Sequence, residues 1–60
     1  MKKSAEDLDV KDYLIEEDVR LVILEVHPLP DRVDVVAYSI TSGLERLLKF
    51  DRKEKVEVSH

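Results

Sequence analysis

The side chains that could act in catalysis are few and widely separated in this chain. The hydroxyl groups considered as nucleophiles are those of Ser39, Thr41, Ser42 and Ser59. Each of them needs an activating base, and the two histidines of the sequence are His27 and His60. No Gly-x-Ser-x-Gly motif is present, and His27 precedes a proline at the end of an apolar run. We therefore predict no catalytic residue and no enzymatic activity.

Metal and cofactor sites are not indicated either. Asp7, Asp9 and Asp12 lack the turn glycine and the terminal glutamate of a calcium-binding loop. Phosphate-binding loops need several glycines, and this chain has one, Gly43. The run Glu16-Glu17-Asp18 is interpreted as a solvated connection. No metal ligand and no cofactor are predicted.

Basic residues gather near the C-terminus and raise the possibility of nucleic-acid binding. The candidate contacts are Arg46, Lys49, Arg52 and Lys53. Acidic residues lie between them, and the net charge of −4 disfavours approach to a phosphate backbone. A small DNA-binding regulator or antitoxin-like protein is therefore the alternative hypothesis, with nucleic acid a possible but disfavoured partner.

The elements that would position these residues begin with a hairpin. Residues 19–27 and 33–41 are rich in β-branched and aliphatic side chains, which favours strands. Between them, Pro28 and Pro30 break the pattern, and Pro30-Asp31 suits a type I turn. Residues 54–59 alternate polar with apolar side chains and predict a C-terminal strand beside the first one.

The segment 43–51 predicts a short helix. Leu44, Leu47 and Leu48 follow the spacing i, i+3 and i+4, and Ser42 with Glu45 resembles a capping box. The alternative is a strand with Leu44, Leu48 and Phe50 on one side.

A weak helix is also predicted near the N-terminus, with Asp9 as the capping residue of a turn that begins at Val10. The predicted fold is thus one α+β domain over residues 1–60, with residues 1–4 disordered. An all-β, four-stranded meander is the alternative.

Both faces of the hairpin are apolar, so something must cover each of them. Leu21, Ile23, Val33 and Val35 are the candidate partner interface. Since both strands are taken as central, replacing Leu24 by Asp is expected to be severely destabilising, because it would bury an unpaired carboxylate.

Length and composition support the need for a partner. For 60 residues, the gain from burying apolar surface and the entropy cost of ordering the chain are each about 90 kcal/mol. The sequence has no cysteine, so disulfides cannot shift this balance. It also has no Asn, Gln or Trp, and 40% of its residues are charged, which is typical of a thermophilic protein.

The resulting hypothesis is a thermostable, cytoplasmic, non-enzymatic protein interaction module, without a membrane span. It would be a homodimer or a small accessory subunit of a larger assembly.

Overall fold

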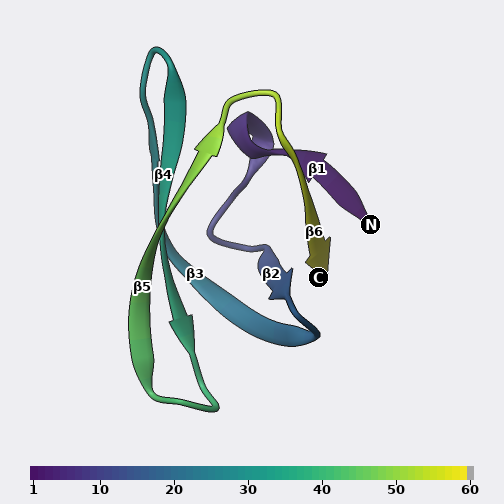
Figure 1. Ribbon diagram of the computed structural model, residues 1–60, viewed down its shortest axis with the longest axis vertical. Coiled ribbons are helices and arrows are strands. Elements are labelled where there is room, and N and C mark those ends of the chain that lie inside the picture. Colours follow the sequence, from purple (N-terminus) through teal and green to yellow (C-terminus); the bar gives the residue numbers. More distant parts are fainter. Residues whose placement is uncertain (60) are drawn as a thin grey trace.

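One antiparallel sheet makes up nearly all of the structure. The computed structural model describes residues 1–59. Its strands follow the order β1-β6-β2-β3-β4-β5 (Figure 1). A single turn of 3₁₀ helix, η1 (Ala5–Asp7), follows the first strand. The strands are β1 (Lys2–Ser4), β2 (Tyr13–Glu16), β3 (Val19–Pro28), β4 (Arg32–Ser39), β5 (Leu44–Asp51) and β6 (Lys55–Ser59).

The α+β prediction is therefore wrong, and the structure fits the all-β alternative, with six strands in place of four. Residues 43–51 are not helical, because β5 pairs along its whole length with β4. This pairing places Leu48 and Phe50 opposite Val35 and Val33, so both side chains pack against the core. Partner-strand contacts thus override a helical spacing that is only two turns long.

The N-terminal helix prediction is also wrong. The amide of Asp12 donates to the carbonyl oxygen of Asp9 at 2.9 Å, which closes a turn, and β2 begins one residue later. β2 then pairs with both β3 and β6, so the segment belongs to the sheet. The structure places β1 within residues 1–4, the segment predicted to be disordered, and pairs it with β6.

The predicted hairpin is confirmed as β3 and β4, and its turn contains Pro30 and Asp31. The amide of Leu29 donates to the carbonyl oxygen of Arg32 at 2.8 Å across this turn. The C-terminal strand is confirmed as β6. It lies between β1 and β2, however, and not beside β3 as predicted.

The link between β5 and β6 forces the sheet to curl. From Asp51 to Lys55 the chain spans at most about 15 Å, whereas the four strand spacings from β6 to β5 would cover about 19 Å in a flat sheet. In a flat antiparallel sheet β5 and β6 would also run in the same direction, so the link would have to return along the strand. Instead β5 rises and β6 descends after the link, as Figure 1 shows.

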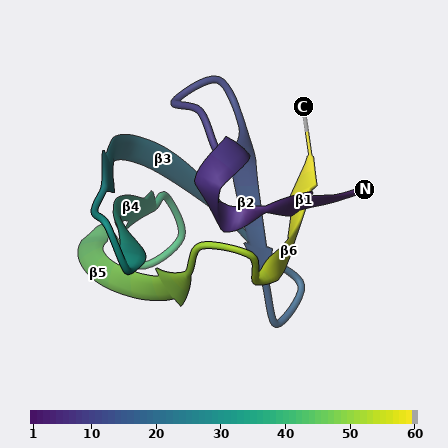
Figure 2. The same cartoon turned by 90° about the horizontal axis from the view of Figure 1, so that it is seen from above.

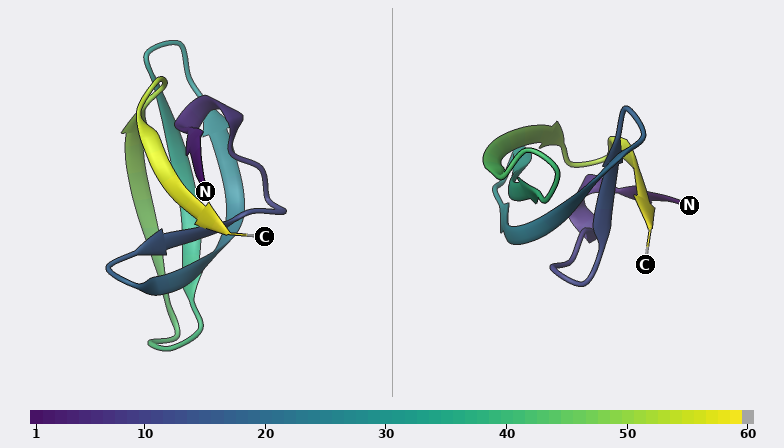
Figure 3. Two further views of the ribbon diagram at one scale, coloured as in Figure 1. Left: turned by 90° about the vertical axis from the view of Figure 1, so that its right-hand side faces the viewer. Right: turned by 90° about the horizontal axis from the view of Figure 1, so that it is seen from below.

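Curling gives the sheet a concave side that holds the core. Figures 2 and 3 show the part formed by β1, β6 and β2 turned toward the concave side of β3, β4 and β5, with η1 between them. Alternate residues of β4 point inward, and those of β2, β3 and β6 meet them. The buried apolar residues are Ala5, Leu8, Leu14, Leu21, Ile23, Val33, Val35, Ala37, Val56 and Val58.

The N-terminal segment is fixed across one end of this core. The backbone amides of Ala5 and Glu6 donate to the carbonyl oxygens of Glu54 and Arg52, at 2.8 and 3.0 Å. The carboxylate of Asp12 is buried, and it pairs with the ammonium group of Lys3 at 2.8 Å. A buried carboxylate needs such a partner, so the ion pair holds β1 and the turn before β2 together.

A β-bulge in β3 changes which residues face the core. Ile23 pairs with Ala37 and Glu25 pairs with Val36, so Leu24 is an extra residue in β3. Its side chain is 43% exposed, whereas Ile23 is 2% exposed. The expectation that Asp at position 24 would bury a carboxylate is therefore wrong, because Leu24 lies on the face opposite to Ile23. Beyond the bulge it is Val26, opposite Val35, that packs against the core.

The turn between β2 and β3 is under backbone strain. Its central residues, Glu17 and Asp18, have φ values of 50° and 66°, the positive angles of a type I′ hairpin turn. That turn usually contains Asn-Gly, since side chains with a Cβ cost about 1–2 kcal/mol per residue in this region. The acidic run predicted as a solvated connection is thus a strained hairpin turn.

We expect Asp18→Gly to raise the free energy of unfolding by about 1 kcal/mol, because glycine adopts positive φ without a Cβ clash. Thermal unfolding followed by circular dichroism measures the effect. Asp31→Gly, at the centre of the turn between β3 and β4, is the matched control. Its φ is not positive, so this change should destabilise the chain slightly. Equal effects of the two substitutions would contradict the turn assignment.

We expect Ile23→Ala to lower the free energy of unfolding by about 2–5 kcal/mol, since it opens a cavity in the core. Leu24→Ala removes a half-exposed side chain and should cost less than about 1 kcal/mol. Urea denaturation of the two variants tests which of these two side chains faces the core. If Leu24→Ala were the more damaging change, the assignment of the inner and outer faces of β3 would be incorrect.

Candidate interaction surface

The convex side of the sheet carries apolar side chains that no segment of residues 1–59 covers. Val22 lies opposite Tyr38 across β3 and β4, and Val36 lies opposite Leu47 across β4 and β5. Leu24 lies beside them at the bulge. We call these five residues, Val22, Leu24, Val36, Tyr38 and Leu47, the convex patch.

The exposure of the convex patch is uneven. Leu24 and Leu47 are 43% and 58% exposed, and the other three side chains are half-buried against their neighbours. At one end, the guanidinium carbon of Arg20 lies 5.3 Å from the centre of the Tyr13 ring, and Tyr13 is the cross-strand neighbour of Val22. The patch therefore consists of aliphatic and aromatic groups with a cation at its edge, a composition common in protein interfaces.

The four residues predicted to contact a partner lie elsewhere. Leu21 and Ile23 are 2% exposed, and Val33 and Val35 are fully buried. All four belong to the core inside the curled sheet, where they pack against β2, β6 and η1. A partner cannot reach them while the chain keeps this fold, so the surface available to a partner is the opposite face.

The four basic residues predicted as nucleic-acid contacts do not form one patch. Arg46 and Lys49 lie on opposite faces of β5, because they are three positions apart in a strand. Arg46 pairs with Glu16 across the concave side. Arg52 and Lys53, in the link between β5 and β6, both pair with Glu6, at 3.2 and 2.9 Å. Carboxylates therefore neutralise three of the four cations.

These ion pairs alter the titration of the carboxyl groups. The hydrogen bond from Lys53 holds the pKa of Glu6 below its ordinary value of 4.5, and the charge of Arg52 adds to the effect. The N-terminal ammonium group of Met1 lies 2.6 Å from Glu57, and this hydrogen bond likewise lowers the pKa of Glu57. Both contacts tie the N-terminal segment to the C-terminal third of the chain.

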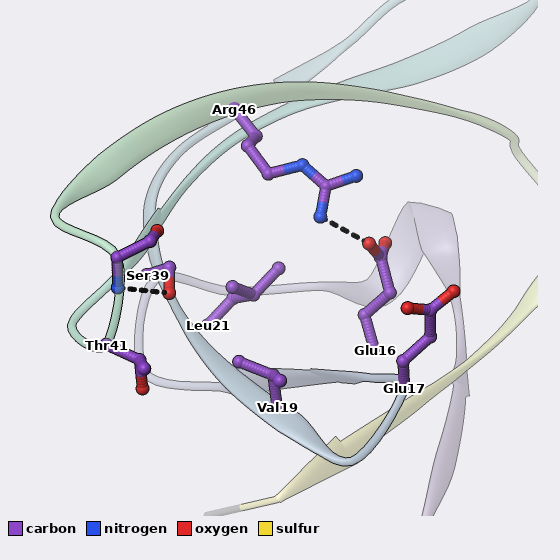
Figure 4. A pocket seen from close by; sticks show the side chains of 8 residues that line it. Glu16, Glu17, Val19, Leu21, Ser39, Thr41 and Arg46 are labelled. Atoms are coloured by element: carbon purple, nitrogen blue, oxygen red, sulfur yellow. Dashed lines mark hydrogen bonds and ion pairs between the residues drawn. The ribbon is translucent and has the colours of Figure 1, made fainter.

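A pocket of about 260 Å³ opens between the β2–β3 turn and the β4–β5 loop (Figure 4). Val19 and Leu21 supply its apolar lining, and Arg46 reaches across it to Glu16. On the other side, the amide of Ser42 donates to the hydroxyl oxygen of Ser39 at 3.3 Å. The pocket is smaller than the roughly 300–1,000 Å³ of most ligand sites, and its guanidinium group, on Arg46, is already paired with Glu16.

Ser42 was predicted to cap a helix together with Glu45, and the structure corrects this role. The hydrogen bond of Ser42 goes from its amide to Ser39, within the loop, while Glu45 lies in β5. Gly43, with φ of 73°, provides the left-handed turn that leads into β5. Ser42 thus belongs to a hairpin loop.

The remaining candidates for chemistry lie apart from this pocket. His27 is exposed on β3, where its Nε2 lies 2.7 Å from Oε1 of Glu25. His60 lies outside the described residues. Within residues 1–59, no group of three or more His, Cys, Asp or Glu side chains is arranged to hold a metal ion, and no helix is long and apolar enough to cross a membrane.

The sequence did not identify the convex patch as the exposed face. Alternation along the two strands does place Val22 and Tyr38 on the same face, but it cannot indicate which of the two faces the rest of the chain covers. The unusual apolar content of both faces was the available signal.

Comparison with protein-family models, curated proteins and solved structures found no match to this chain.

We expect the chain to lose stability as the pH falls below about 4.5, because the ion pairs of Glu6 and Glu57 are lost on protonation. Each folded-state pKa lies below the unfolded one, so the contribution is complete above the unfolded value and disappears as the pH falls through the folded value. Glu6→Gln should therefore reduce the pH dependence of the melting temperature in this acidic range.

The control for this measurement is Asp7→Asn, which removes a neighbouring exposed carboxylate that forms no salt bridge within residues 1–59. This variant should keep the pH profile of the wild type. A Glu6→Gln variant whose melting temperature follows the wild-type profile would show that the Glu6 ion pairs add no stability.

Proposed function

We propose that this chain is a non-enzymatic protein interaction module that binds its partner through the convex patch. The observation that carries the proposal is the exposure of Leu24 and Leu47 beside Val36 and Tyr38. The chain is a homodimer or a small subunit of a larger assembly, and it acts in the cytoplasm.

The packing of the sheet supports this proposal. The concave side takes up the apolar residues of η1, β2 and β6, so no segment within residues 1–59 remains to cover the convex side. Each apolar group that a partner removes from water contributes about 25 cal/mol per Å². For a chain of 60 residues, whose own core is small, such a contribution is a large part of the total stability.

Charge supports a protein partner over nucleic acid. The net charge is −4, and Arg46, Arg52 and Lys53 are engaged with carboxylates. A phosphate backbone would have to displace these carboxylates before it gained any contact. An apolar patch needs no such exchange when a protein surface covers it.

Site-specific photo-cross-linking tests the proposal. A photoreactive benzoylphenylalanine is placed at Leu47, within the convex patch, and the full chain is irradiated both purified and in extract of its source cells. We expect one adduct of discrete mass, because a docked partner holds its side chains against position 47.

The matched control places the same probe at Lys11, which is exposed in the connection before β2. This position should give no discrete adduct. Absence of an adduct from position 47 under both conditions, or the same products from both positions, would contradict a docking role for the convex patch.

A further inference from the structure

The strand β5 has one free edge, and it lacks three of the features that protect sheet edges, which are short length, proline and a bulge. β5 is the last strand of the sheet and pairs only with β4. Its eight residues contain no proline, and its pairing with β4 shows no bulge. The strand at the other edge, β1, has three residues. Long, regular edge strands present unpaired N–H and C=O groups to any strand that can align with them.

The side chains of β5 are also open to a partner. Six of its eight residues are exposed, and Leu44 and Leu47 are 64% and 58% exposed. Glu45, Leu47 and Lys49 lie on the convex side, since they are opposite Tyr38, Val36 and Asp34 of β4. The concave side of β5 carries Leu44, Arg46, Leu48 and Phe50.

This sequence is complementary to itself in the antiparallel direction. If a two-fold axis passes through Leu47, Glu45 of each copy lies opposite Lys49 of the other, and the two Leu47 side chains meet on the axis. On the concave side, Leu44 of each copy lies opposite Phe50 of the other. Opposite charges and apolar pairs in these positions stabilise antiparallel strands.

The neighbouring registers are less favourable. An axis through Arg46 would place the two Arg46 side chains directly opposite each other. An axis through Leu48 would place Glu45 opposite Asp51. Like charges in directly opposite positions destabilise a strand pair, so charge selects the axis at Leu47.

We propose that two copies of this chain associate edge to edge through β5, antiparallel and with Leu47 on the two-fold axis. The two sheets then form one continuous sheet, and the convex patches of both copies meet along the Leu47 pair. An isologous two-fold contact of this kind is closed, so it yields a dimer and not a fibre. This inference rests on the proposed function, for which it names a second copy as the partner at the Leu47 end of the convex patch. Val22, Leu24 and Tyr38, which lie on β3 and β4, remain on the joined convex face.

Charge reversal in the full chain, followed by sedimentation equilibrium, tests this arrangement. In a dimer of Glu45→Lys, each of the two pairs formed by positions 45 and 49 consists of two lysines that repel each other. In a dimer of Lys49→Glu, each of these pairs consists of two glutamates that repel each other. Each variant alone should raise the dissociation constant of the dimer about tenfold or more. Circular dichroism confirms that each variant is folded before its mass is measured.

Mixing the two variants provides the specific readout. In a heterodimer of Glu45→Lys with Lys49→Glu, every position 45 again faces an opposite charge at position 49, so association should return to near the wild-type value. Asp31→Lys, a charge reversal at the β3–β4 turn, should leave the dimer unchanged. Recovery on mixing alone requires that position 45 of one copy lies against position 49 of the other.

Three results would overturn the inference: a monomeric wild-type chain, a dimer insensitive to both reversals, or no recovery on mixing. A monomer whose position 47 still cross-links to a different protein would overturn the second copy as partner and leave the interaction module standing. A monomer without any adduct at position 47 would overturn both proposals.

Discussion

The three-residue link between β5 and β6 is the constraint on which the rest of the structure depends. It joins the last strand of the sheet to a strand near the opposite edge, over a distance that a flat sheet would not allow. The sheet must therefore curl, and curling gives a single sheet an inside and an outside. Within residues 1–59 there is no helix longer than the single turn η1, so the curled sheet packs its core against itself.

The inside and the outside then have different chemistry. Inside, Leu21, Val33 and Val35 pack against β6 and η1, and the Lys3–Asp12 ion pair fixes the N-terminal strand at one end. Outside, Leu24 and Leu47 remain in contact with water. Within residues 1–59 the apolar residues of η1, β2 and β6 pack on the concave side, and this leaves the convex patch uncovered.

The candidate site was partly predictable. The apolar character of both hairpin faces indicated that a second surface must be covered, and this observation still supports the proposed function. The face was misassigned because Leu21, Ile23, Val33 and Val35 are equally apolar, and only the curl makes theirs the inner one. The basic residues were predicted as nucleic-acid contacts because the sequence does not show which carboxylates lie beside them. Glu6 and Glu16 are distant in sequence, but in the fold they pair with Arg52 and Arg46.

The sequence by itself determined the β3–β4 hairpin, its proline turn and the C-terminal strand, because β-branched composition and proline act over a few residues. Tertiary structure alone decided that residues 43–51 extend along β4, that β6 lies between β1 and β2, and that Val26 faces the core after a bulge at Leu24. Each of these depends on which distant strand a segment meets. Neither the helical spacing of three leucines nor a regular alternation of side chains indicates which distant strand a segment will contact. Backbone pairing across the sheet outweighs the helix or strand propensity of one short segment.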